Sequence, residues 1–492
     1  MPGTMVSGHS PSMDITAESN APRGFTPPRP NGALMRLMGV VNRWLLLFGL
    51  PWLRRVPFVR DLPLARGYFW LRRLDLPTAD AERLRQAVNP LSAAFLAPNH
   101  PEFGFDWMMD KEISTRVAPR MASWASHHIV ASAPRFWLAN NLVANDGGDA
   151  AVDYSVRTAL RGDAVLLHPE GMVRWTADKV HAPFEGIAQL AIEAARRAAH
   201  EGVNRPVFIV PIVWKLVHAG DVSDALRAEM ARIEKSLGLD SSDNPNVAER
   251  FRRLQENVLS LRAERFGAIS LDWAPSFFER QHTLRMYLVR DLETRHSIER
   301  SDDLDRRIHR LEKAIRAARA GLRSAATHSV SSSTDATLRD DLAMVEEATR
   351  LGGFTRDVYG GEVLTQEQIG ESLKRLRASL LRGGLRNAAH NFLPAPFGPR
   401  VAHVRVPEPI LVDPKRAASG PDRPAHVAEL LARVRSAQQS ALDSINREVA
   451  PMVARFAHPN PFSGDRVAAR SRSSRSATGP TSASDAGRLL SV

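Results

Sequence analysis

The chain has 492 residues, enough for two to four domains or for one large α/β domain with additions, and 43% of them are hydrophobic, as in ordinary globular proteins. It has no cysteine, which excludes disulfides, thiolate metal ligands and a thiol nucleophile. Its net charge of +12 predicts an anionic partner: lipid headgroups, an acidic carrier protein, the phosphates of coenzyme A or nucleic acid.

The N-terminal residues divide into two segments. Residues 1–32 are polar and rich in Pro, Gly and Ser, without the apolar run of a signal peptide, which predicts a disordered N-terminus. Residues 33–88 begin with apolar clusters that alternate with Arg, and we expect an amphipathic helical segment that associates with a membrane. The alternative is an ordinary amphipathic helix packed on the next domain. Four aromatic residues with polar edges lie in this segment: Trp44, Trp52, Tyr68 and Trp70.

No transmembrane helix is expected. The most apolar stretch, residues 44–53, is closed by Arg on both sides, and its length is well below the roughly 20 residues that a spanning helix needs.

Residues 89–218 carry the strongest pattern of alternating elements. Short apolar runs at 93–97, 164–167 and 207–213 predict buried strands. Helical patterns lie between them, at about 106–117, 152–161 and from 187 onward. Strands that alternate with helices predict an α/β fold with a mainly parallel sheet flanked by helices.

His100 follows the first of these strands, in a loop bounded by Pro98 and Pro101. Asp106 comes six residues later, where the next helix begins. A spacing of six does not place two side chains on one helix face, so the pair meets only if His100 lies in the loop and Asp106 in the first helical turn. Such a pair suits a general base and the carboxylate that fixes its tautomer.

The order of motifs resembles the phospholipid/glycerol acyltransferase family. The motifs are Asn99-His100-Pro101 followed by Asp106, then a strand ending in Pro169-Glu170-Gly171, then the apolar strand 207–213. The likeness covers roughly residues 90–217. It implies transfer of a fatty acyl group from acyl-CoA or acyl-carrier protein to the hydroxyl of a glycerolipid or lysophospholipid, as in phospholipid biosynthesis. His100 would be the general base and Asp106 its partner, without a metal and without a cofactor beyond the acyl donor.

The resemblance also implies which residues hold the substrates, namely Asn99, Glu170 and Gly171. This sequence departs from the family's pattern in the spacing of two pairs of residues. Five residues separate His100 from Asp106 where the family has four, and Gly104 is expected to absorb the extra residue as a tight bend. The family's Arg two places after the Gly is replaced by Val173, with Arg174 one place later.

The third departure concerns the acceptor. The stretch 142–146 lacks the Arg with which the family contacts the acceptor phosphate, and this leaves Arg157 and Arg174 as candidates. A lysophospholipid, another alcohol and a glycerol-3-phosphate-like acceptor all stay open.

The second half of the chain is predicted to hold a helical insertion in the α/β domain, followed by the strand and helix that complete this domain. Residues 219–398 have helical patterns almost throughout, including a heptad stripe over 304–322 that predicts a helical hairpin. Residues 402–412 return to strand character and are expected to rejoin the sheet, since the resembled family has a similar strand soon after the one at 207–213. A helix over about 425–456 closes the domain, whose last unit spans 399–457. The Ser/Arg-rich tail, 458–492, is expected to be disordered.

Together these features predict a peripheral membrane acyltransferase on the cytoplasmic face of the membrane. One alternative is a catalytically weakened acyltransferase fold that binds lipid or serves as a scaffold. A nucleic-acid-binding protein is the other, suggested by the charge, but the sequence argues against it because no recognised nucleic-acid module is present.

Overall fold

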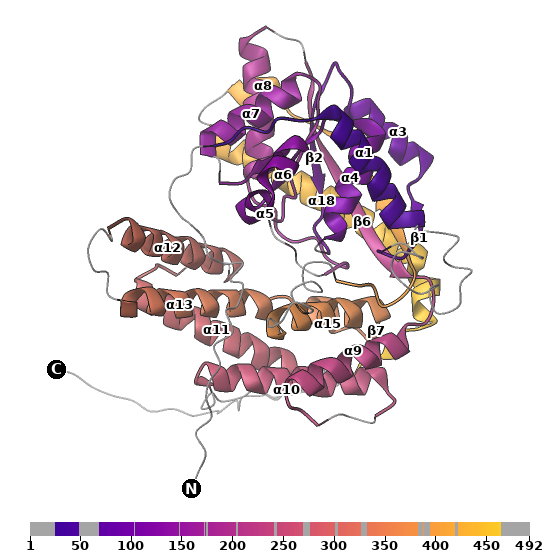
Figure 1. The fold of residues 1–492 in the computed structure, drawn as a ribbon, viewed down its shortest axis with the longest axis vertical. Coiled ribbons are helices and arrows are strands. Elements are labelled where there is room, and N and C mark those ends of the chain that lie inside the picture. The colour runs from indigo at the N-terminus through magenta and orange to yellow at the C-terminus, as the bar shows by residue number, and fades with distance from the viewer. Residues whose placement is uncertain are drawn as a thin grey trace, which may run out of the picture.

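A computed structural model describes the chain in the following ranges, to which all structural statements refer: 25–48, 68–102, 104–146, 148–171, 173, 176–202, 205–240, 244–268, 276–300, 304–325, 332–381, 387, 394–418 and 422–463. The described residues form a mixed sheet covered by helices, with a helical lobe beside it (Figure 1).

The main sheet is mostly parallel. Its order is β1-β8-β6-β2-β5-β3-β4, with β9 paired to β6. The pairs β6–β2, β2–β5, β5–β3 and β3–β4 are parallel, whereas β8 and β9 run antiparallel to β6. The strands are β1 (Leu71–Asp75), β2 (Ala93–Pro98), β3 (Ala122–Ala125), β4 (Leu142–Ala144), β5 (Val165–Leu166), β6 (Val207–His218), β8 (Arg400–Arg405) and β9 (Ile410–Leu411).

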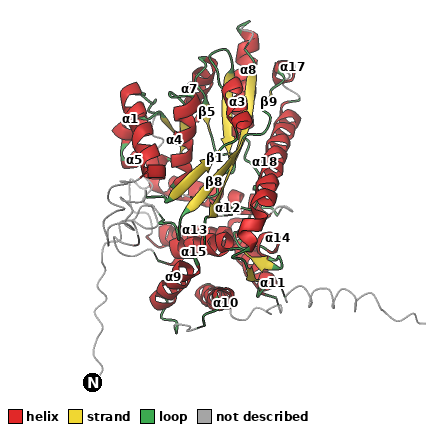
Figure 2. Ribbon diagram, turned by 90° about the vertical axis from the view of Figure 1, so that its right-hand side faces the viewer, coloured by secondary structure: helices red, strands yellow, loops and turns green. Residues whose placement is uncertain are grey.

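Right-handed crossovers explain which helices cover which face. The connection from β2 to β3 moves one way along the sheet, and those from β4 to β5 and from β5 to β6 move the other way. Helix α4 (Phe105–Val117) therefore lies on one face, and α7 (Gly148–Leu160) and α8 (Gly186–His200) lie on the opposite face. Helix α18 (Arg423–Ala454) also covers this second face, as Figure 2 shows.

Side chains alternate between the two faces along each strand. In β2, Ala93, Phe95 and Ala97 pack with α7 and α8, while Ala94 and Leu96 pack with α4 and with α3 (Thr78–Ala87). Both faces are buried, which explains why the strands read as continuous apolar runs.

Further helical elements of the sheet domain lie in the described ranges. They are α1 (Gly32–Arg43) with the π-helical turn η1 (Trp44–Phe48), α5 (His127–Ser132), α6 (Pro134–Ala139) and α17 (Pro414–Ala418). Helix α1 packs on α4, where Asn42 Nδ2 donates a hydrogen bond of 2.9 Å to Met108 O.

Within 219–398 the described residues form a helical lobe with its own apolar core. The predicted hairpin is confirmed, because Ile308, Leu311 and Ile315 are buried and α12 packs against α13. The lobe consists of α9 (Ser223–Ser236), α10 (Val247–Arg265), α11 (Phe277–His296), α12 (Leu304–Ala325), α13 (Ser332–Leu351), α14 (Arg356–Tyr359), β7 (Val363–Leu364) and α15 (Gln366–Leu380).

The strands expected at 93–97, 164–167 and 207–213 are present, and the return of 402–412 to the sheet is confirmed by the pairing of β8 with β6. Three expectations need correction. Residues 71–75, assigned to a helical membrane segment, form β1, because the edge of β8 offers backbone partners that a sequence pattern does not reveal.

The other two corrections concern the expected disordered ends. In the N-terminal segment, Asn31 caps α1 and its N–H donates to Ala139 O, so residues 25–32 are held on the sheet domain. At the C-terminal end, β10 (His458–Pro459) pairs with β7, and Phe462 is buried among aromatic side chains of the helical lobe. Residues 1–24 and 464–492 lie outside the described residues.

Candidate functional site

The site begins at the end of β2, where the parallel strands present their carboxyl ends. Asn99 anchors the loop: its Nδ2 donates to Trp214 O at 3.0 Å, and its Oδ1 accepts from Trp214 N at 2.9 Å. Because Trp214 belongs to β6, this pair fixes the loop to the neighbouring strand. His100 follows directly, with 20% of its side chain exposed. An imidazole at this edge is reachable from solvent yet held on a rigid strand end.

Gly104 brings Asp106 to His100. Its φ of 77° and ψ of −43° lie where a side chain is strained, and they turn the chain sharply into α4. Asp106 then lies in the first turn of the helix, and its Oδ2 is 2.5 Å from His100 Nδ1. The predicted bend is confirmed, and the extra residue between His100 and Asp106 does not separate them.

Asp106 is held by more than His100. The side chain is 2% exposed, its Oδ1 accepts from Trp214 Nε1 at 3.0 Å, and its Oδ2 accepts from Glu102 N at 3.2 Å. Burial raises the pKa of Asp106 well above its usual range, whereas the charge of His168 and the N–H donated by Trp214 act against burial and favour the carboxylate form that an orienting partner needs. Since Nδ1 of His100 faces this carboxyl group, the nitrogen that would take a proton from a substrate is Nε2.

The Pro-Glu-Gly motif meets the same loop. Glu170 is 2% exposed, and its Oε1 accepts from the backbone N–H of His100 at 3.3 Å. Gly171 has φ of 68°, and a Cβ built there would lie 2.7 Å from the Phe184 ring. The structure thus brings together Asn99, His100, Asp106, Glu170 and Gly171 from two motifs far apart in sequence.

The two predicted arginines do not join this cluster. Arg157 lies on the exposed face of α7 and pairs with Asp153 at 2.6 Å. Because α7 runs from the end of β4 back to the start of β5, its last turn lies toward the amino ends of the strands, away from His100. The prediction for Arg157 therefore finds no support in the fold. Arg174 lies outside the described residues.

Several residues that the sequence did not single out also belong to the site. His168, just after β5, stacks on His100 with ring centroids 4.1 Å apart and an angle of 15° between the rings. Asp110 lies one helical turn after Asp106, and its Oδ2 is 3.1 Å from His168 Nε2. The i, i+4 spacing of Asp106 and Asp110 was the available signal, since it places both carboxyl groups on one face of α4.

Glu102 ties the loop to the rest of the molecule. Its carboxyl oxygens contact Lys374 Nζ at 2.7 Å and Arg400 Nη1 at 2.6 Å, and all three side chains are buried. Burial raises the pKa of Glu102, but the two cations outweigh it and bring the pKa below its usual value. Glu102 is therefore an anionic anchor of the loop.

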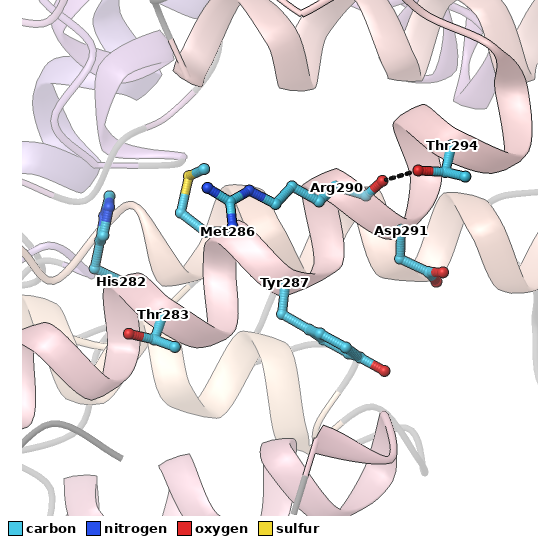
Figure 3. A pocket seen from close by; sticks show the side chains of 7 residues that line it. All are labelled: His282, Thr283, Met286, Tyr287, Arg290, Asp291 and Thr294. Atoms are coloured by element: carbon cyan, nitrogen blue, oxygen red, sulfur yellow. Dashed lines mark hydrogen bonds between the residues drawn. The ribbon is translucent and has the colours of Figure 1, made fainter. Parts of the chain in front are cut away.

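Two other features of the described residues are poor candidates for a catalytic site. Asp75, His403 and Glu448 approach one another closely enough to hold a metal ion, but Arg405 already pairs with both carboxylates, at 3.2 and 2.5 Å. An open pocket of about 570 Å³ lies on the helical lobe (Figure 3). All its lining side chains come from α11, and it lacks a paired acid and base: His282, Thr283, Met286, Tyr287, Arg290, Asp291 and Thr294.

Comparison with known proteins gives no family assignment: no family model matches the chain, and no curated protein matches it. None of the helices in the described part of the chain combines the length and the apolar character needed to cross a bilayer.

Proposed function

We propose that the protein is an O-acyltransferase of the phospholipid/glycerol type. The observation that carries this proposal is the contact between His100 Nδ1 and Asp106 Oδ2, at 2.5 Å, on the carboxyl edge of a parallel sheet. Glu170 reaches the same loop from the next strand, so that both motifs of the sequence resemblance converge on His100.

The reaction needs one proton carrier. His100 Nε2 takes the proton from the acceptor hydroxyl as its oxygen attacks the thioester carbonyl carbon of the donor. Collapse of the tetrahedral intermediate breaks the carbon–sulfur bond, and the proton passes from Nε2 to the departing sulfur. An ester and a free thiol are the products. Asp106 holds the imidazole in the tautomer with Nδ1 protonated and stabilises the imidazolium that forms.

The donor would be acyl-CoA or acyl-carrier protein, and the acceptor a lysophospholipid or a glycerol-3-phosphate-like alcohol. The net charge of +12 supports an anionic donor or carrier. The proposed location is the cytoplasmic face of a membrane. Helix α1 supports contact with a membrane surface, because Leu37 and Val40, one turn apart, are 58% and 69% exposed beside the exposed Arg36.

The test is an acyl-transfer assay with purified full-length protein. Labelled acyl-CoA and acyl-carrier protein are each offered with a panel of lysophospholipids and with glycerol-3-phosphate. Wild type is compared with His100→Ala and with a matched control, His296→Ala. The control also breaks a His–Asp pair, of 2.8 Å with Asp341, and its histidine is 17% exposed against 20% for His100, but it lies in the helical lobe.

We expect transfer to at least one acceptor, a loss of about 10²–10⁴-fold in His100→Ala, and retention in His296→Ala. Equal rates in wild type and His100→Ala would contradict the assignment. If folded wild type transfers to no acceptor but sediments with lipid vesicles, the alternative of a lipid-binding or scaffolding protein is favoured.

A further inference from the structure

His168 is largely buried among groups of the candidate site. Its ring stacks on His100 at 4.1 Å and meets the Trp214 ring edge-on, with centroids 5.9 Å apart. Only 11% of its side chain is exposed.

The contacts of His168 suit a ring that is protonated on both nitrogens. Nδ1 is 3.0 Å from Asn99 O, a carbonyl oxygen that can only accept, so Nδ1 carries a proton. Nε2 is 3.1 Å from the Asp110 carboxyl group, and an ionised carboxylate also only accepts. With an ionised Asp110, both nitrogens donate and the ring is an imidazolium. Burial lowers the pKa of His168, but Asp110 and Asp106 outweigh it and raise the pKa to about 9.

We propose that His168 is a permanent cation that lowers the proton affinity of His100, so that His100 remains an unprotonated base at neutral pH. This inference rests on the proposed function, because it assumes that His100 is the base. Two cations in stacked rings repel each other, and the ring with the weaker hold on its second proton gives it up. Since both N–H groups of His168 are already used, the residue acts through His100 and not on the substrate. It is a positioning residue.

The carboxylates around the pair act in the opposite direction to the charge of His168. Asp106 and Asp110 both come from α4 and face His100 and His168 respectively. Glu170 faces the backbone N–H of His100. Glu102 lies behind Asp106, and its charge is balanced by Lys374 from α15 and Arg400 from β8. Removal of the His168 charge therefore leaves the carboxylates to raise the proton affinity of His100.

The first test needs no substrate. Nitrogen-15 NMR of histidine-labelled full-length protein counts the protons on each imidazole, and comparison with His168→Phe and His100→Ala assigns the two signals. We expect both nitrogens of His168 to be protonated at pH 7.5, while His100 carries one proton. A His168 ring with one protonated nitrogen at that pH would overturn the proposal, whether or not acyl transfer is ever detected.

The second test is the pH dependence of His100. His168→Phe keeps a stacked ring without the charge, and His168→Phe/Asp110→Leu removes the ion pair as a unit if the single variant folds poorly. We expect the titration midpoint of His100, and the acid limb of the acyl-transfer rate, to move about one pH unit higher in these variants. An unchanged midpoint would refute the proposed tuning. Absence of acyl transfer in wild type would refute the proposed function. The NMR measurement would still show whether His168 is charged.

Discussion

Lys374 Nζ lies 2.7 Å from Glu102 Oε1, and this ion pair joins the helical lobe to the loop that carries His100. Both side chains are buried, and Arg400 Nη1 completes the cluster at 2.6 Å from Glu102 Oε2. Glu102 also donates its backbone N–H to Asp106. The pair therefore links α15 to the partner of the proposed base through a single residue.

The same helix also holds the segment that follows Gly171. Gln368 Nε2 donates to Asp178 Oδ2 at 3.1 Å, and Glu371 Oε2 accepts from Ala177 N at 3.1 Å. Figure 2 shows α15 beneath the sheet domain. Helix α15 thus contacts segments next to both motifs of the site, which gives the inserted lobe a structural role in the sheet domain.

Replacement of Lys374 by Met tests this role. It leaves the Glu102 carboxylate with one cation instead of two in a buried site, and we expect a loss of at least about 2 kcal/mol in the free energy of unfolding. The acyl-transfer rate should fall about tenfold or more, because the loop carrying His100 loses an anchor. Denaturant titration and the transfer assay measure the two effects.

Lys235→Met is the matched control, because Lys235 is an exposed lysine on α9 of the same lobe. Its free energy of unfolding should change by less than about 0.5 kcal/mol. If Lys374→Met matched this control in both stability and rate, α15 would have no part in supporting the site.

Asp106→Asn tests the orienting carboxylate. The amide is nearly isosteric with the acid, but it does not hold His100 in the tautomer with Nδ1 protonated and does not stabilise the imidazolium. We expect the maximal rate to fall about 10²–10⁴-fold with little change in the KM for the acyl donor. A rate that stays within a factor of about three of wild type would show that Asp106 has no part in catalysis.

Gly104→Ala tests the bend that places Asp106. Gly104 has φ of 77°, and a Cβ there should cost about 1–2 kcal/mol of stability and displace the first turn of α4. Gly202→Ala is the control, since Gly202 has φ of 66° with open space around its Cβ position at the far end of α8. Both variants should lose thermal stability, but only Gly104→Ala should lose activity. Equal activities would place the bend outside the mechanism.

The raised pKa of Glu371 predicts that the free energy of unfolding depends on pH. Burial, and then the nearby Asp178, raise its pKa to about 8. The folded protein therefore keeps a proton on Glu371 that the unfolded chain releases near the ordinary carboxyl pKa of about 4.5. Because the unfolded state binds fewer protons in this window, stability falls as pH rises from about 4.5 to 8 and is level above it.

Glu371→Gln removes this titration while its amide oxygen can still accept from Ala177 N. The difference in unfolding free energy between the variant and wild type should move in favour of the variant by about 1–3 kcal/mol between pH 5 and 8. Glu299→Gln, an exposed glutamate, should show no such trend. If the unfolding free energies of wild type and Glu371→Gln changed in parallel with pH, the raised pKa assigned to Glu371 would be contradicted.

The sequence was informative where a pattern is local. The apolar runs of β2, β5 and β6 and the periodicity of α12 depend on neighbours a few residues apart, so they identify elements reliably. β1 was missed because Leu71-Arg72-Arg73-Leu74 buries little on its own and becomes a strand only beside β8, far along the chain.

Some residues of the candidate site could also be found from local sequence patterns, and others could not. His100 and Asp106 were found because a loop, a glycine and a helix start lie within one short stretch. His168 was passed over because a histidine at a strand end has no signal of its own, and only the fold stacks it on His100. The Glu102–Lys374 contact was beyond the reach of sequence patterns, since it joins two separate units of the fold.

The central claim is most directly tested by measuring both products of one reaction. Free thiol from the acyl donor and new ester on the acceptor are quantified together for wild type, His100→Ala and His296→Ala. We predict one thiol for each ester in wild type and in His296→Ala, and loss of both products in folded His100→Ala. Thiol release without ester, or equal ester formation in His100→Ala, would contradict acyl transfer with His100 as the base.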